Sequence, residues 1–159
     1  MLEKCQDAKE RWGGVSDIID HWLEERQGLI SAFVHLPQHP VDNELAQQVE
    51  LFCELLMDYL SSGHFEVYEQ LLREGSEFND GSVEEAQKLF PEIQHSTNLA
   101  LDFNDQYAST AIFSVQIVRE LANDLSGLGE KLEERFELED RMIEVLHTSH
   151  SNLTPEMTP

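Results

Sequence analysis

Apolar residues recur every three or four positions along almost the whole chain, and this period restricts the fold more than any other feature. Such spacing gathers apolar side chains on one face of an α-helix. The sequence contains no clear stretch of apolar–polar alternation bounded by hairpin turns, which is the pattern typical of half-buried strands. Four long amphipathic segments with short connections therefore predict an all-α protein, an antiparallel helical bundle.

Glycine and proline divide this pattern into segments. Gly13-Gly14 predicts a break or a kink between a short preceding turn or helix and the first long helix, and Pro37 with Pro40 ends that helix. Ser61-Ser62-Gly63 interrupts the second helix, because Gly63 permits a tight turn or a positive φ. Pro91 kinks or restarts the third. We expect helices over residues 15–36, 42–74, 83–107 and 112–146, one domain over 1–148, and a flexible polar tail over 149–159.

The net charge of the chain restricts the classes of molecule that it can bind. The chain has 32 acidic and 10 basic residues, for a formal net charge of −22. Nucleic acid and anionic membranes carry the same sign, so we expect neither as a direct partner. Basic protein surfaces suit this charge, although it also serves solubility alone. The sequence lacks a signal peptide and any apolar run of roughly 18 residues, and its two cysteines suit a reducing compartment, so we expect a cytoplasmic protein.

Three strings resemble the Rsd/AlgQ family in their order and spacing. They are DHWL at 20–23 followed by Glu25-Arg26, DYLSSGHFEVYE at 58–69, and EERFELED at 133–140. The middle string is the most specific, because a polar and aromatic run of twelve residues rarely arises by chance. The likeness spans roughly residues 1–146, and the residues at 1–3 and 11–15 resemble the AlgQ branch most closely.

This resemblance implies an anti-sigma function. Members of the family are helical bundles that bind region 4, the DNA-reading domain of the primary sigma subunit of RNA polymerase. Binding sequesters that subunit and favours alternative sigma factors, and AlgQ-like members are linked to the control of alginate. The sequence leaves open whether a second regulatory protein binds and whether the protein self-associates.

The resemblance and the charge together predict an acidic surface that meets the basic helix-turn-helix of region 4. Asp58, on the flank of an apolar stripe, is the first candidate. Asp20 and Glu24 extend the same patch if the first two helices are neighbours. Phe65 is either an exposed apolar anchor or a core residue. The expected partner-binding set is completed by Ser62, His64 and Glu69.

Two charged residues lie on the apolar seam of the last helix. Arg135 and Glu139 are four apart, at positions where long apolar residues are expected. A pair that faced the core would need further partners, such as His21 or Tyr68. We expect instead that the apolar seam turns toward Phe136, so that Arg135 and Glu139 lie at the boundary between the core and the surface. The motif residues with an expected structural role are Trp22, Tyr59, Gly63, Tyr68, Arg135, Phe136 and Glu139.

Other functions have weaker support. A di-iron or hemerythrin-like bundle uses Glu-x-x-His motifs, and the chain has two, at 92–95 and 144–147. His95 falls on the polar side of its helix and His147 near a helix end, so we expect no metal and no other cofactor. The sequence also lacks a phosphate loop and a nucleophile elbow, and we expect no catalytic residues. A helical adaptor or chaperone with another client is a third possibility.

Overall fold

The computed structural model describes the backbone of residues 2–150 and the side chains of residues 14–150. Within this range every regular element is helical, which confirms the all-α prediction. None of the described helices combines the length and the apolar character needed to cross a bilayer. The elements are α1 (Leu2–His35), the 3-10 turn η1 (Leu36–Gln38), α2 (Leu45–Ser62), the π-helix η2 (Gly63–Val67), α3 (Tyr68–Ser76), α4 (Ser82–Gln87), α5 (Phe90–Tyr107), α6 (Val115–Leu146) and the 3-10 turn η3 (Thr148–His150).

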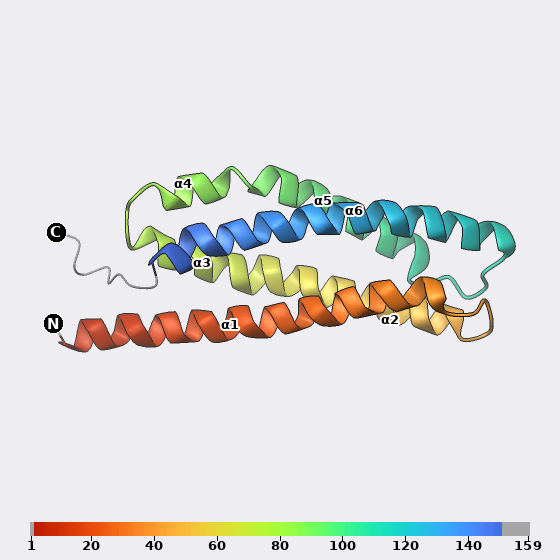
Figure 1. Ribbon diagram of the computed structural model, residues 1–159, viewed down its shortest axis with the longest axis horizontal. Helices are drawn as coiled ribbons and strands as arrows, with labels where there is room; N and C mark the ends of the chain where they lie inside the picture. Colours follow the sequence, from red (N-terminus) through yellow and green to blue (C-terminus); the bar gives the residue numbers. More distant parts are fainter. Residues whose placement is uncertain (1, 151–159) are drawn as a thin grey trace.

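These elements form four antiparallel rods (Figure 1). The first rod is α1, the second is α2 continued by η2 and α3, the third is α4 followed by α5, and the fourth is α6. The start of α1 and the end of α6 lie at the same end of the bundle (Figure 1). Along the bundle α1 packs on α2, α2 on α5 and α5 on α6, while α3 and α4 also pack on α6.

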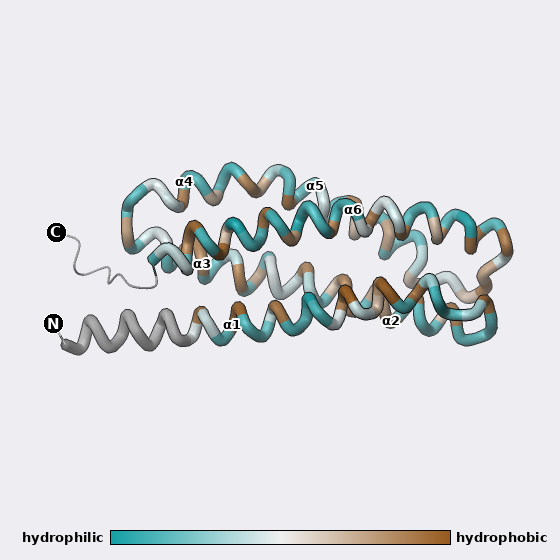
Figure 2. The backbone as a smooth tube through the Cα atoms, viewed as in Figure 1, coloured by the Kyte–Doolittle hydropathy of each residue, from teal (hydrophilic) through white to brown (hydrophobic). Residues whose placement is uncertain are grey.

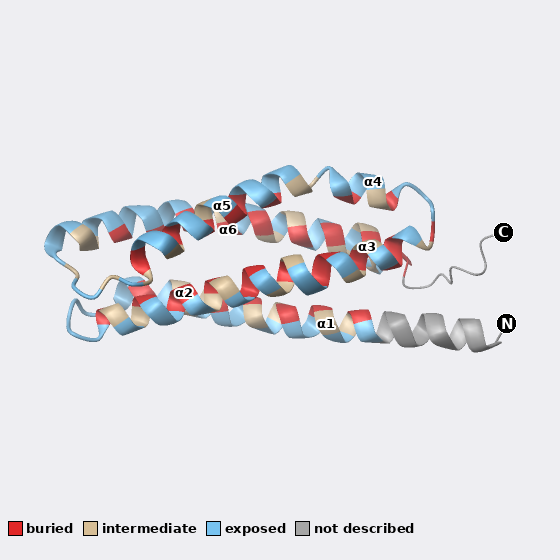
Figure 3. Cartoon of the chain, turned by 180° about the vertical axis from the view of Figure 1, so that it is seen from behind, coloured by how far each residue is buried: buried red, intermediate tan, exposed pale blue. Residues whose placement is uncertain are grey.

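The core lies where the apolar stripes of the rods face one another (Figures 2 and 3). Aromatic rings fill its centre, where Trp22 stacks on Tyr59 with ring centroids 4.9 Å apart. Trp22 also donates a hydrogen bond from Nε1 to the Tyr59 carbonyl oxygen at 3.2 Å. The indole therefore fixes α1 against α2 by both burial and a directional bond.

The first helix is longer than the sequence pattern predicts. We expected a break at Gly13-Gly14, but the backbone of α1 is helical from Leu2 to His35. Glycine lowers helix stability by about 1 kcal/mol relative to alanine, yet it keeps both backbone hydrogen-bonding groups. Unlike proline it therefore disfavours a helix without ending it. The prediction of a break there was wrong.

The interruption expected near Ser61–Gly63 is a wider helical turn. The Tyr68 N–H bonds to the Gly63 carbonyl oxygen, five residues back, which defines a π-helix. Gly63 itself is right-handed, with φ −60° and ψ −56°, so the expected positive φ was wrong. Glycine is needed there for space, because a Cβ atom would lie 3.2 Å from Trp22 Cζ2 and 3.3 Å from Tyr68 Cζ.

The remaining boundaries follow local signals. The expected third helix restarts at Pro91, which lies in the first turn of α5, after the short α4. Ser114 caps α6, because its Oγ accepts the Ile117 N–H at 3.2 Å. Thr148–His150 form η3, and His150 is buried against Phe78 with ring centroids 3.8 Å apart. The rest of the expected tail, 151–159, lies outside the described residues.

Candidate protein-binding surface

Two charged residues of α6, Arg135 and Glu139, form a fully buried ion pair. Arg135 Nε donates to Glu139 Oε2 at 3.1 Å, and neither side chain has any exposed area. The expectation that this pair lies at a boundary was therefore wrong. The Arg135 guanidinium also donates to Thr97 Oγ1 at 2.6 Å, to Ser96 Oγ at 3.0 Å and to the Tyr68 hydroxyl at 3.0 Å. Each bond satisfies a donor that burial would otherwise leave unpaired.

The carboxylate of Glu139 is equally well bonded. The Tyr59 hydroxyl donates to Oε1 at 2.5 Å, and the Tyr68 hydroxyl donates to Oε2. Burial raises the pKa of Glu139, while Arg135 and the two hydroxyl groups act in the opposite direction. Burial and the nearby Glu139 carboxylate raise the pKa of both tyrosines, so both hydroxyl groups keep their protons.

Arg26 completes this network. It belongs to the first of the three family strings, but no site role was predicted for it. Its Nε donates to the Tyr59 hydroxyl at 3.0 Å, and its Nη1 pairs with Asp140 Oδ1 at 2.6 Å. The guanidinium also lies 4.8 Å from the ring centroid of Phe136. A signal was present, because position 26 continues the buried stripe between Trp22 and Leu29. Of the expected partners of the pair, Tyr68 is correct and His21 is wrong, since His21 is exposed beside Glu25.

His64 joins the buried network to the surface. Its Nε2 lies 3.3 Å from Arg135 Nη2 and 2.8 Å from Thr97 Oγ1. Because arginine can only donate, Nε2 accepts that bond and the proton of the neutral imidazole resides on Nδ1. Burial, followed by the Arg135 charge, lowers the pKa of His64. The side chain is thus a neutral, fixed part of the π-helix.

Phe65, the next residue, points away from the core. It is 80% exposed, so the alternative in which Phe65 is a core residue was wrong. Beside it an apolar groove of about 430 Å³ runs between α2 with η2 and α5. Leu101 is 37% exposed at this groove. The other lining residues are Met57, Leu60, Ser61, His64, Gln94 and Thr97.

Exposed carboxylates lie on the same rod as Phe65. Asp58 and Glu69 are exposed, and no lysine or arginine occurs between residues 45 and 72 or between 90 and 107. Both helices that border the groove are therefore free of strongly basic side chains. On α1 the candidates Asp20 and Glu24 are also exposed, and α1 packs along α2, as a shared patch requires.

Ser62 has a structural contact in this region. Its hydroxyl donates to the Glu25 carboxylate, at 3.3 Å to Oε1 and 3.2 Å to Oε2. This bond ties the end of α2 to α1 next to the exposed acidic residues. Ser62 is half-buried, in contrast to Asp58 and Phe65.

The two Glu-x-x-His motifs do not build a metal centre. Glu92 and His95 are exposed on α5. His147 is engaged elsewhere, with Nδ1 2.7 Å from Glu74 Oε1 and Nε2 3.0 Å from Ser16 Oγ. Among residues 14–150 no group of three or more His, Cys, Asp or Glu side chains is placed to hold a metal ion.

A helical bundle that presents an exposed ring and apolar groove among carboxylates is typical of a regulator that acts by binding another protein. A family model described as "Regulator of RNA polymerase sigma(70) subunit, Rsd/AlgQ" matches residues 1–147. The chain belongs to this Rsd/AlgQ family of sigma(70) regulators. These regulators are binding proteins and not enzymes.

Curated relatives support the same family. The chain is 35% identical over 152 residues to the Regulator of sigma D of Pectobacterium carotovorum, covering 92% of this chain and 99% of that protein. It is 32% identical over 149 residues to the Yersinia pseudotuberculosis protein of the same name, covering 91% and 88%. No solved structure matches the chain. The relatives support the family as a whole and not its AlgQ branch in particular.

Proposed function

We propose that the face of α2, η2 and α5 around Phe65 binds region 4 of the primary sigma factor. In this proposal the protein sequesters the sigma subunit in the cytoplasm and favours alternative sigma factors. The observation that carries the proposal is the 80% exposure of Phe65 beside an apolar groove. An exposed aromatic ring next to a pocket is a common centre of a protein interface.

Charge supports region 4 as the partner. A helix-turn-helix domain presents arginine and lysine to DNA phosphates. Both helices that border the groove carry carboxylates and neither lysine nor arginine. Asp58, exposed seven residues before Phe65 on the same rod, is the carboxylate that we assign to direct contact. Glu69, His64, Asp20 and Glu24 belong to the rim of the proposed interface, and Ser62 supports it through Glu25.

We further infer that the chain falls in the AlgQ branch of the family, with a role in the control of alginate. The sequence at 1–3 and 11–15 supports this branch, although all but Gly14 and Val15 lie outside the described side chains. A second regulatory protein that competes for the acidic face would release the sigma subunit.

Calorimetry with the isolated region 4 domain tests the main proposal. The wild-type protein is expected to bind, with an affinity that falls as salt rises. Asp58→Asn should weaken binding about tenfold, roughly 1.4 kcal/mol, and reduce the salt dependence. Glu130→Gln, which removes an exposed carboxylate on α6, is the matched control and should change binding less than about twofold.

Two outcomes would contradict the proposal. One is the absence of binding at micromolar concentrations with both proteins folded. The other is an equal loss in Asp58→Asn and Glu130→Gln, because net charge and not a particular face would then govern binding.

A further inference from the structure

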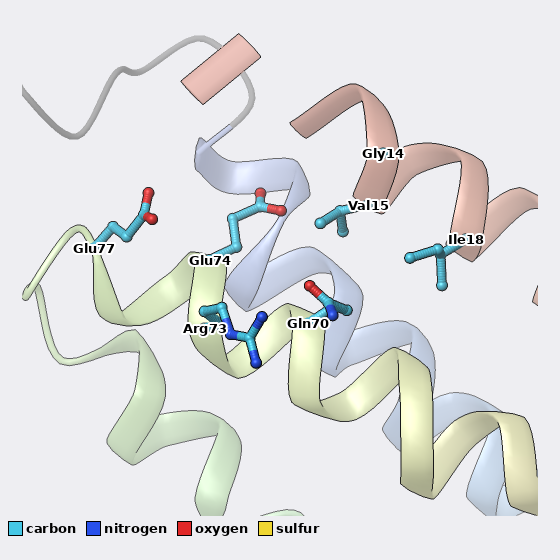
Figure 4. A pocket seen from close by; sticks show the side chains of 7 residues that line it. All are labelled: Gly14, Val15, Ile18, Gln70, Arg73, Glu74 and Glu77. Carbon is cyan, nitrogen blue, oxygen red and sulfur yellow. The ribbon is translucent and has the colours of Figure 1, made fainter. Parts of the chain in front are cut away.

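A second pocket lies away from the groove at Phe65, between the first and second rods near the end of the bundle where α6 ends (Figures 1 and 4). It encloses about 270 Å³. Figure 4 shows Val15 and Ile18 projecting from α1 toward α3, with the Glu74 carboxylate in the space between the helices. The remaining lining residues are Gly14, Gln70, Arg73 and Glu77.

Glu74 is the unusual residue of this pocket. Only 3% of its side chain is exposed. Oε1 lies 2.7 Å from His147 Nδ1, and His147 is held in turn by Ser16. Oε2 is buried and has no hydrogen-bond partner among the residues that the structure describes. A buried carboxylate oxygen loses its hydration, so a ligand that donates a hydrogen bond to Oε2 would be stabilised there.

We propose that this pocket binds an alkylammonium group, which supplies the missing donor to Glu74 Oε2. An ammonium carries several N–H donors and a charge opposite to that of the carboxylate, and such charge-assisted bonds are strong. Val15 and Ile18 give the methylene stem of the ligand an apolar wall. Gln70, half-buried in the lining, adds an amide oxygen.

The lining favours an organic cation over a metal ion. Calcium and magnesium take six or more oxygen ligands, and the described residues form no such group of three or more acidic, histidine or cysteine ligands. Among the described residues of the lining, Arg73 is the one basic side chain, and it is exposed. Its positive charge therefore repels a bound cation more strongly at the rim of the pocket than at the buried end, where Glu74 lies.

The ammonium has two chemical sources, a free polyamine or the lysine side chain of a partner. Spermidine and Nα-acetyl-lysine amide represent them as probes in calorimetry and methyl NMR. Both are measured with excess Mg²⁺, which suppresses general attraction to a protein of charge −22. Tighter binding of spermidine would indicate the polyamine, and tighter binding of the lysine amide would indicate the side chain.

Matched variants locate the site. Glu74→Gln keeps the shape of the side chain and should weaken binding about tenfold. Glu84→Gln removes an exposed carboxylate on α4 and should change it less than about twofold. If Glu74→Gln does not fold, Gly14→Leu narrows the pocket with Glu74 intact, and Gly28→Leu on the same helix is its control. A Cβ atom meets nothing within 4 Å at either glycine.

The expected result is saturable binding at one site, with chemical-shift changes at the Val15 and Ile18 methyl groups. Shifts spread over the surface, loss of binding in Mg²⁺, or equal weakening by Glu74→Gln and Glu84→Gln would overturn the proposal. Absence of binding by both probes would do so as well, and a buried water would then satisfy Glu74. Sigma binding is not part of this test, so its outcome is independent of the proposed function.

Discussion

Arg135 and Glu139 lie one turn apart on α6, with Nε 3.1 Å from Oε2 and no exposed area on either side chain. Their partners come from the other long rods: Tyr59 and Tyr68 from the second, Thr97 from the third, and Arg26 from the first. A polar network thus crosses the centre of the bundle. Buried ion pairs contribute little net stability but are costly to break, since one partner removed leaves the other charged and unpaired.

Arg135→Met should therefore destabilise the fold by about 3–5 kcal/mol, because Glu139 then lacks its main counter-charge. The double variant Arg135→Met with Glu139→Met should lose less than the sum of the two single changes. Urea unfolding measures both. Lys131→Met, which breaks the exposed pair with Glu134, is the control and should cost less than about 1 kcal/mol. An Arg135→Met protein as stable as that control would contradict this reading of the network.

Gly63→Ala should destabilise the protein by about 1–3 kcal/mol despite the better helix propensity of alanine. The new Cβ would press on Trp22 and Tyr68, and both rings are held in place, one stacked on Tyr59 and the other bonded to Glu139. Gly28→Ala, where a Cβ meets open space, should instead stabilise by about 0.5–1 kcal/mol. Thermal unfolding of the two variants is the comparison. Equal effects would mean that the rings can move aside.

Phe65→Ala should weaken binding to the sigma(70) region 4 domain about tenfold or more and leave the free energy of unfolding within about 0.5 kcal/mol. The ring is 80% exposed and has little packing to lose. Ile112→Ala is the matched control, because Ile112 is 79% exposed in the connection between α5 and α6. If both changes weaken binding equally, the interface is not centred on Phe65.

Asp80 should make the stability of the fold depend on pH, and the lowered pKa of its carboxyl group determines the direction. Hydrogen bonding by Ser82, and also by His150, lowers the pKa of Asp80 from 3.8 to about 2. A carboxyl group whose pKa is lower in the folded state adds stability above its unfolded pKa and loses it as the pH falls through the folded pKa. Asp80→Asn should thus be less stable than the wild type near neutral pH, and the difference should shrink between about pH 4 and pH 2.

Urea midpoints measured across that pH range for both proteins provide the test. Asp42→Asn, an exposed aspartate in the connection before α2, serves as the comparison. A difference between wild type and Asp80→Asn that stays constant down to the lowest pH would show that the ionised carboxylate is not the origin of the effect.

Local patterns predicted the helices well because each helix is encoded by its own residues. The restart at Pro91 follows from a single residue with a known backbone preference. The buried position of Arg135 did not follow, because its partners Tyr68 and Thr97 are distant in sequence. Periodicity within one helix cannot identify such partners.

The candidate surface was predictable to a similar extent. Asp58 is exposed on the flank of the stripe, as its position relative to Tyr59 predicts. The exposure of Phe65 was not predictable, because it depends on the phase of the π-helix.

The π-helix also determines which changes in chain length this segment tolerates. A π-helical turn holds one residue more than the α-helical turn it replaces, so loss of one residue in η2 would leave a continuous α-helix with α3 close to its present phase. Within α3 no wide turn can absorb such a loss, and the residues that follow would rotate by about 100° around the axis. In the evolution of this chain, deletions of one residue should therefore be more frequent between Ser62 and Tyr68 than within α2 or α3.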